Sequence, residues 1–431
     1  MRDLPTPASI RDATGRGRSL RERPIGCFAG AGISTESRAV LQQTLYDQLA
    51  AELDVKDDAL SFPELMSRFQ QDKGRRLLLQ RIKERFDYVD DFPELRRIAT
   101  RFQQELSTLF YVEDIITTNW DTYFEDVAQA LPLVSDKDFG LSDLPGRKVL
   151  KIHGSIHNPG SIIATENDYR RCYRSLNRSV LGGTLKHLLA TKTPLFVGYS
   201  FRDPDFNRIW RFMEREMSDL LPRAVVVTLD QRPSTVKSAR TITTDAAYFI
   251  QVLKTHLLPR GCLLPDGRWD AIVQTLVDIE FRHAELYEKL NLQRVPAAVL
   301  CGHYQDGLIH AFERMLARHG SGEYSHVHRV EHVLRDYAEL RTTRVRARRY
   351  HDVAYIDGYQ NGLLFLIADD VERRALPLYY VYGGSDDLRS LTAFRREAAR
   401  AEALHRSAYK QARRIARQWS PGIIPHHRPE L

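Results

Sequence analysis

Five short apolar runs, each ending in glycine or polar residues, constrain the fold of this chain more than any other feature. They are Ile25–Ala29, Val112–Thr118, Lys148–His153, Pro194–Tyr199 and Arg223–Leu229. The segments between these runs show mostly helical patterns. Strands that alternate with helices predict an α/β fold with a doubly wound parallel sheet. Ligands of such sheets bind beyond the carboxyl ends of the strands, and the polar motifs of this chain fall at those ends.

The length of 431 residues suits two domains behind a polar leader. We expect the leader at residues 1–24, an α/β domain at residues 25–290 and a smaller α+β domain at residues 295–431. In the smaller domain, Asp357–Gly362 has the composition of a hairpin turn between strands at 353–356 and 363–367. A third strand is expected at 377–382, followed by a long helix at 391–419.

Composition and charge exclude several classes of protein. No apolar run reaches the length of about 18 residues that a membrane span needs, and the leader lacks the apolar segment of a secretory signal. The four cysteines (Cys27, Cys172, Cys262 and Cys301) lie far apart, which argues against a disulfide scaffold and favours the cytoplasm. A net charge of +7 on so long a chain does not predict direct binding of nucleic acid.

The first candidate motif is Gly30-Ala31-Gly32, directly after the first strand. Glycines between a strand and a helix let the backbone approach a pyrophosphate, and Ser34 adds a hydroxyl or caps the helix. Glycines also serve any tight turn, so this motif alone does not decide between the two interpretations.

Two further strand ends carry the side chains of a candidate catalytic site. Asn119 offers a donor and an acceptor that can hold a ribose hydroxyl and a water. His153 is suited to act as a general base. Three roles stay open for Asp121: ordering Asn119, contacting ribose, or capping the next helix.

The last two strand ends add candidates for the nucleotide. Gly198 and Ser200 suit a second approach to a phosphate or ribose. Asp230 is a candidate for the adenosine ribose, with a turn role as the alternative.

The ordered motifs FAGAGIS, TTNWD, KIHGS and FVGYSFRDPDF resemble the sirtuin family, above all its bacterial branch found in anti-phage defence proteins. The segments Ile162–Tyr169 and Thr244–Leu253 are similar to that branch as well, so the resemblance covers residues 20–260. It implies a Rossmann-like core that binds NAD as a substrate, with Asn119 and His153 as catalytic residues. The implied NAD-binding residues are Ala29, Gly30, Ala31, Gly32, Ile33, Ser34, Thr118, Asp121, Gly198, Tyr199, Ser200 and Asp230.

Two departures from the sirtuin deacylases narrow the expected activity. Between Gly154 and Val197 only Cys172 is available, so the four thiolates of the deacylases' structural zinc are missing. We expect no zinc and no other metal site in this protein. The Gly-Ile-Pro-Asp-Phe-Arg-like run that follows GAGIS in deacylases is also absent, because Thr35–Leu41 reads TESRAVL. Both departures argue against an acyl-lysine substrate.

The sequence thus predicts an NAD+ glycohydrolase that releases nicotinamide and ADP-ribose as a defence effector. An NAD-dependent deacylase or ADP-ribosyltransferase and a non-catalytic NAD or ADP-ribose sensor are the alternatives. Control is expected from homo-oligomerisation or a partner, and the resemblance implies a HerA-type translocase as one such partner.

Three other patterns outside these motifs carry little weight. His328-Arg329-Val330-Glu331-His332 matches an inverted zinc-protease pattern, but no third ligand motif follows and a solvated helix is the preferred interpretation. Arg341–Arg349 is interpreted as a charged face of a helix or strand, and His426-His427 near the chain end carries still less weight.

Overall fold

A computed structural model of the chain describes residues 24–55, 60–199, 204–229, 239–260, 263–384, 388–418 and 426–429. The chain divides into two compact units. One extends to Arg260 and includes Gly320–Glu323, and the other comprises Gly261–His319 and the residues from Tyr324 onward. The division places the helix at 267–289 in the second unit, and the functional division of the chain stays a prediction.

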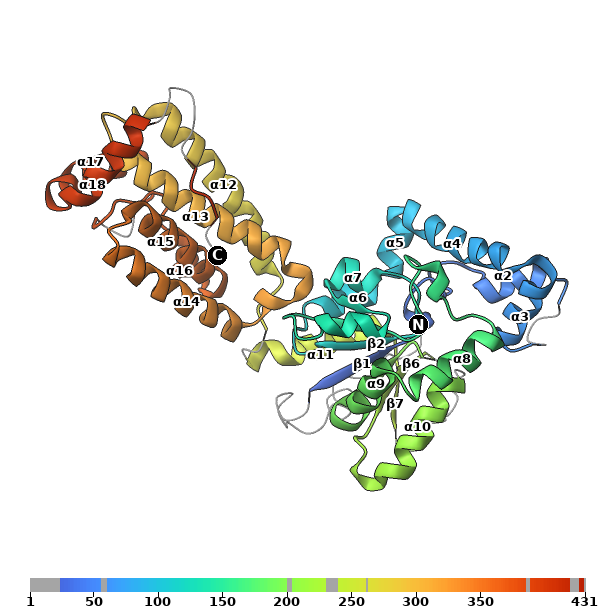
Figure 1. Cartoon of the computed structure of the whole chain (residues 1–431). Coiled ribbons are helices and arrows are strands. Elements are labelled where there is room, and N and C mark those ends of the chain that lie inside the picture. The colour runs from blue at the N-terminus through green and yellow to red at the C-terminus, as the bar shows by residue number, and fades with distance from the viewer. Residues whose placement is uncertain are drawn as a thin grey trace. The chain divides into compact units, whose positions relative to one another are not determined.

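The first unit is built on a parallel sheet (Figure 1). Its described strands are β1 (Ile25–Ala29), β2 (Asp114–Thr117), β3 (Leu131–Leu133), β4 (Lys148–Lys151), β5 (Thr193–Val197), β6 (Val225–Thr228) and β7 (Arg240–Thr243). They follow the order β3-β4-β2-β1-β5-β6-β7 with every pairing parallel. The predicted doubly wound sheet is confirmed. The pattern does not predict β3 and β7, because β3 is three residues long with a proline at its centre and β7 (RTIT) has a single apolar residue.

Helices cover both faces of the sheet (Figure 1). Phe28, Phe196 and Val226 on one face share a buried cluster with residues of α8, α9 and α10, and α6, α7 and α11 lie on the opposite face. Helices α2, α3 and α4 form a separate buried cluster with Ile162 and Ala164, which follow the KIHGS motif. The described helices are α2 (Leu45–Glu52), α3 (Phe62–Lys73), α4 (Arg75–Asp91), α5 (Pro93–Ala99), α6 (Arg101–Ser107), α7 (Tyr123–Ala128), α8 (Glu166–Leu176), α9 (Val180–Thr191), α10 (Pro204–Met217) and α11 (Ala246–Leu257).

The described part of the second unit is helical, so the expected α+β character of residues 295–431 is wrong. The segment with the predicted hairpin is one continuous helix, α15 (Tyr350–Ile367), and no described residue of 377–382 lies in a strand. The predicted long helix is two helices, α17 (Leu391–Leu404) and α18 (Arg406–Gln418). The remaining helices are α12 (Gly267–Lys289), α13 (Ala297–Ala317), α14 (Val327–Arg346) and α16 (Asp370–Arg374).

Close helix packing explains why glycines with a turn-like composition lie inside α15. A Cβ on Gly358 would lie 1.9 Å from the carbonyl oxygen of Tyr304 on α13, and a Cβ on Gly307 of α13 would lie 2.0 Å from that of Tyr355. A Cβ on Gly362 would come within 2.7 Å of Ala311. The glycines therefore let two helix backbones touch, which compensates for their low helix propensity.

We expect Gly358→Ala to lower the free energy of unfolding of the second unit by about 3 kcal/mol, because the added methyl overlaps backbone. Gly183 of α9 is the matched control, since no atom lies within 4 Å of its Cβ position. Gly183→Ala should raise stability by about 0.5–1 kcal/mol through helix propensity. Urea unfolding followed by circular dichroism measures both changes. Equal effects of the two substitutions would contradict this account of the packing.

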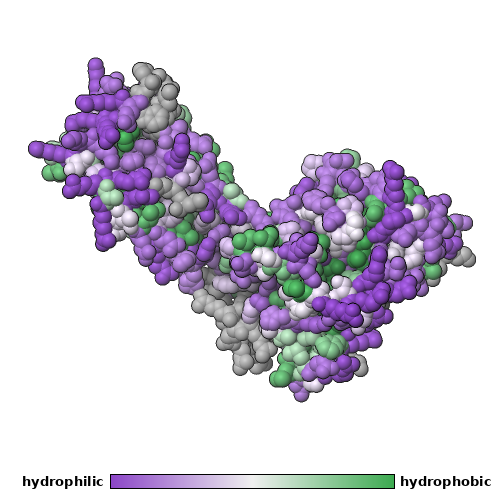
Figure 2. All heavy atoms as spheres, viewed as in Figure 1, coloured by the Kyte–Doolittle hydropathy of each residue, from purple (hydrophilic) through white to green (hydrophobic). Residues whose placement is uncertain are grey.

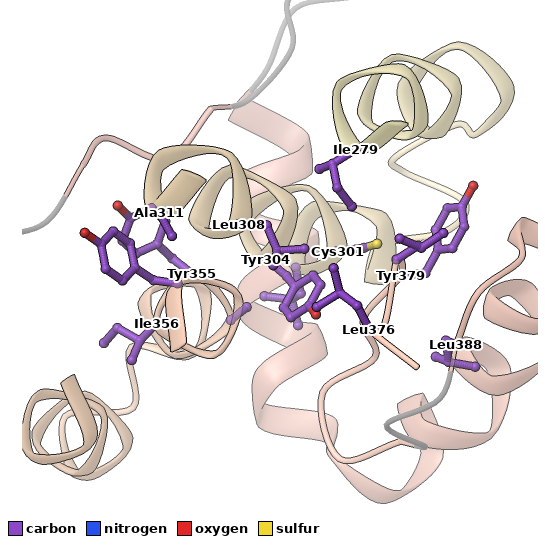
Figure 3. Packing of buried hydrophobic residues seen from close by; sticks show 14 of the residues in the cluster. Ile279, Cys301, Tyr304, Leu308, Ala311, Tyr355, Ile356, Leu376, Tyr379 and Leu388 are labelled. Atoms are coloured by element: carbon purple, nitrogen blue, oxygen red, sulfur yellow. The ribbon is translucent and has the colours of Figure 1, made fainter. Parts of the chain in front are cut away.

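The core of the second unit combines aromatic and aliphatic side chains. Figure 3 shows Cys301, Tyr304 and Leu308 of α13 among the buried residues of neighbouring elements. The molecular face in Figure 2 is mostly hydrophilic, with small separate hydrophobic areas. Among the described helices, none is both long and apolar enough to cross a membrane.

Candidate functional site

The strand register brings four sequence motifs to one edge of the sheet. Ala29 at the end of β1 pairs with Thr117 of β2 and with Val197 of β5, and Thr117 pairs with Lys151 of β4. These four residues form one row across the sheet. The candidate residues Gly30, Asn119, His153 and Gly198 follow within one or two positions of that row, as the chain order of the motifs predicts.

The glycines of the first and fourth motifs pack two loops against each other. The N–H of Gly30 donates to Val197 O over 3.0 Å, and that of Gly32 donates to Gly198 O over 3.1 Å. A Cβ on Gly30 would lie 2.5 Å from Gly198 O. Gly198 itself has a φ of +57°, and its Cβ would lie 2.7 Å from Ile33 N. Loop packing therefore requires these glycines, while Ala31 and Gly32 keep exposed backbone at the sheet edge.

No α-helix begins directly after this glycine turn, in contrast to the sequence-based expectation. Ala31–Ile33 is one 3-10 turn, and the next α-helix starts at Leu45. The buried guanidinium of Arg85 on α4 accounts for the irregular stretch, because it donates to Thr35 O and Gln43 O and pairs with the Glu36 carboxylate. A pyrophosphate at this turn would therefore not meet the N-terminus of an α-helix, and the N–H groups of Gly30, Gly32, Ile33 and Ser34 already donate to backbone carbonyls.

Hydrogen bonds hold Asn119 beside the glycine turn and leave its side-chain oxygen without a partner among the described residues. Its Nδ2 donates to Gly30 O over 3.2 Å, and its backbone N–H donates to Thr117 Oγ1 over 3.0 Å. The residue is only 5% exposed, and within the described residues its Oδ1 accepts no hydrogen bond. A buried acceptor without a partner costs about 1–3 kcal/mol. This carbonyl oxygen is therefore placed to accept a hydrogen bond from a ligand or a water.

Asp121 joins the first two motifs. Its Oδ2 accepts a 2.5 Å hydrogen bond from Ser34 Oγ, and its Oδ1 accepts one from the N–H of Tyr123 at the start of α7. Burial raises the pKa of Asp121, and the nearby Lys151 ammonium opposes that shift. Of its three open roles the structure shows helix capping, together with the bond to Ser34. A contact with ribose stays a prediction.

Lys151 is a positioning residue that sequence reasoning missed. Its fully buried ammonium pairs with Glu125 Oε1 at 2.9 Å and donates to the backbone carbonyl of Asp121. It thereby fixes the turn that carries Asn119 and Asp121. The signal in the sequence is a lysine at the buried end of an otherwise apolar strand, where an ammonium needs a partner.

His153 is buried (4% exposed) beyond the end of β4. Its carbonyl oxygen accepts from Ile163 N at 3.0 Å, and its ring packs edge-on against Tyr169 of α8 with a 4.9 Å centroid separation. Gly154 has a φ of +84°, and its Cβ would lie 2.2 Å from Ser161 O. The segment that follows the KIHGS turn thus packs against it at Gly154 and hydrogen-bonds to it at His153.

That following segment, Ile162–Tyr169, is anchored to α4. Arg75 donates to Asp168 Oδ2 at 2.7 Å and to Ile162 O at 2.6 Å. Partial burial alone would raise the pKa of Asp168, but hydrogen bonds from Thr165, Ala164 and Arg171 lower it below its usual value. This ionised carboxylate accepts hydrogen bonds at the start of α8 and so orients the helix that carries Tyr169.

The remaining predicted residues are placed as follows. Ala29 is buried and its carbonyl oxygen accepts from Thr117 Oγ1, while Thr118 and Ile33 are half-buried and Tyr199 is buried beside Phe196. Ser200 and Asp230 lie outside the described residues. NAD contacts of all these residues stay predictions.

Comparison with known proteins agrees with the sheet and the motifs. Residues 113–253 match the family model of the SIR2-like domain. The resemblance to the sirtuin family is confirmed. The matched SIR2-like segment contains β2 through β7 and therefore includes Asn119, His153 and Gly198.

Sequence relatives of the chain include three proteins named NAD(+) hydrolase ThsA. Identity is 29% over 203 residues with that of Cytobacillus dafuensis (44% of this chain, 38% of the relative). It is 26% over 211 residues with that of Bacillus cereus strain MSX-D12 (46% and 41%) and 30% over 192 residues with that of Enterococcus faecium (42% and 38%). The chain thus spans about two fifths of the length of these curated relatives.

Proposed function

We propose that this chain is an NAD+ glycohydrolase that cleaves NAD+ to nicotinamide and ADP-ribose. The observation that carries the proposal is the buried Oδ1 of Asn119, which has no hydrogen-bond partner among the described residues. It lies beside the Gly30 turn, at the sheet edge where His153 also lies. The hydrolase name of these relatives supports the same activity.

Hydrolysis of NAD+ requires a positioned water and a base that accepts its proton, but no acid for the leaving nicotinamide. Water attacks C1′ of the nicotinamide ribose, the glycosidic C–N bond breaks, and its electron pair neutralises the pyridinium nitrogen. Nicotinamide therefore leaves as a neutral molecule without protonation. His153 accepts the proton of the attacking water and passes it to solvent, while Asn119 Oδ1 accepts a hydrogen bond from that water or from a ribose hydroxyl.

The incubation of purified full chain with NAD+ tests this proposal. We expect nicotinamide and ADP-ribose in equal amounts, measured by liquid chromatography. Deacylation of an acetyl-lysine peptide without this hydrolysis would support a deacylase instead. Binding of NAD+ without turnover, alone and with a partner, would support a sensor.

We also propose a role in anti-phage defence with control by assembly. An exposed apolar row on α12 supports self-association, since Val273, Val277 and Phe281 are spaced one turn apart and are 49%, 62% and 66% exposed. A HerA-type translocase as partner and a cytoplasmic location rest on the family resemblance and on the sequence composition, and both stay predictions.

A further inference from the structure

A cluster of histidines surrounds one buried carboxylate in the second unit. Asp306 of α13 is 2% exposed. His426 Nδ1, from the end of the chain, lies 2.9 Å from Asp306 Oδ1, and His283 Nε2 of α12 lies 3.7 Å from the same oxygen. His303 Nδ1, one turn before on α13, lies 3.8 Å from Oδ2, which also accepts the backbone N–H of His427 at 2.6 Å.

Asp306 lacks the arginine partners that Asp352, another buried carboxylate of this unit, has. Asp352 is fully buried and pairs with Arg349 at 2.5 Å and Arg344 at 3.3 Å, besides two histidines. In the part of the chain that the structure describes, no lysine or arginine pairs with Asp306. A buried carboxylate without a fixed cation is costly unless another positive group binds it.

An imidazole without a hydrogen-bond partner among the described residues lies near the same carboxylate. His303 is 4% exposed, and neither of its ring nitrogens has a hydrogen-bond partner among the described residues. Buried polar groups are rarely unsatisfied, and a missing ion is one of the usual reasons. The carboxylate that lacks a cation and the imidazole that lacks a partner thus face each other.

The spacing of the ligand atoms suits a metal ion. The ligand atoms of His283, Asp306 and His426 all lie within 4.8 Å of one another. Two ligands at about 2.0–2.1 Å from a tetrahedral zinc ion are roughly 3.4 Å apart. The observed separations from Asp306 Oδ1, 2.9 Å and 3.7 Å, lie on either side of that value.

We propose that His283, Asp306 and His426 bind one divalent transition-metal ion of the zinc type, while His303 lies beside the other carboxylate oxygen of Asp306. Zinc and chemically similar divalent transition metals bind imidazole nitrogens and carboxylate oxygens, and three such protein ligands are enough for a zinc site. The ion supplies the positive charge that Asp306 lacks. Because His426 belongs to the end of the chain, the ion also ties that end to α12 and α13. This site is separate from the four-cysteine module of the deacylases.

The test is titration of the EDTA-treated, dialysed full chain with Zn²⁺ in an isothermal calorimeter. We expect one equivalent to bind, and we expect Asp306→Asn and His426→Ala each to weaken the affinity at least tenfold. His426 is 59% exposed at its side chain, so its loss should leave folding intact, which a thermal melt checks. Zn²⁺ should raise the melting temperature of the native chain and of the control variant His328→Ala/His332→Ala, but not that of His426→Ala.

The matched control is His328→Ala/His332→Ala on α14. These two histidines are one turn apart and exposed at 71% and 55% of their side chains. Loss of binding in this control, with retention in His426→Ala, would place the metal on α14 and overturn the proposal. Absence of saturable binding at micromolar Zn²⁺ in the native chain would overturn it as well.

Discussion

Replacing His153 by alanine is expected to lower the rate of NAD+ cleavage about 10²–10⁴-fold, the range for a lost general base. Asn119→Ala should lower it at least about 10²-fold, because it removes a preorganised polar group from the reacting centre. Nicotinamide release at saturating NAD+ measures both effects. The loss should appear in kcat more than in KM, since both groups act on the reacting atoms.

Matched controls separate chemistry from folding. His157 lies four residues after His153 and is exposed, and Asn167 is exposed on α8. His157→Ala and Asn167→Ala should retain the native rate. If His153→Ala keeps its native melting temperature and also its native rate, the histidine is not the base, and the proposed mechanism is wrong.

The second large effect concerns stability. Lys151→Met leaves the buried Glu125 carboxylate and the Asp121 carbonyl without their ammonium partner. We expect the free energy of unfolding to fall by about 3–5 kcal/mol, as for other buried pairs that lose one member. Urea unfolding at pH 7 measures this. Lys148→Met serves as the control, because the half-buried Lys148 lies at the opposite end of the same strand and donates to the backbone carbonyls of Leu144 and Gly146.

The pH dependence of this variant has a defined sign. Burial already raises the pKa of Glu125, opposed by Lys151. Without that ammonium the folded-state pKa rises further above the unfolded value, so the folded state binds more protons than the unfolded one. The stability of Lys151→Met should therefore increase as pH falls through the folded pKa of Glu125. Lys151→Met/Glu125→Gln should recover part of the loss at pH 7, and no recovery would mean that the carboxylate is not the cause.

The sequence by itself determined the central strands of the sheet and the sheet edge at which the candidate residues lie. Apolar runs with polar ends predict β1, β2, β4, β5 and β6, because central parallel strands are buried on both faces and must be continuously apolar. Chain order and parallel pairing then predict that Asn119 and His153 lie at one edge. Local pattern suffices for these features because each depends on neighbours in the sequence.

Only the tertiary structure decided which role each glycine and each charge has. Gly358 and Gly362 have turn composition, yet they lie in a helix because α13 packs against them at backbone distance. Lys151 has its partners, the Glu125 carboxylate and the Asp121 carbonyl, on the neighbouring turn and helix. His426 reaches Asp306 across 120 positions of the chain. Such contacts depend on groups that are distant in sequence and adjacent in space, and no local pattern records them.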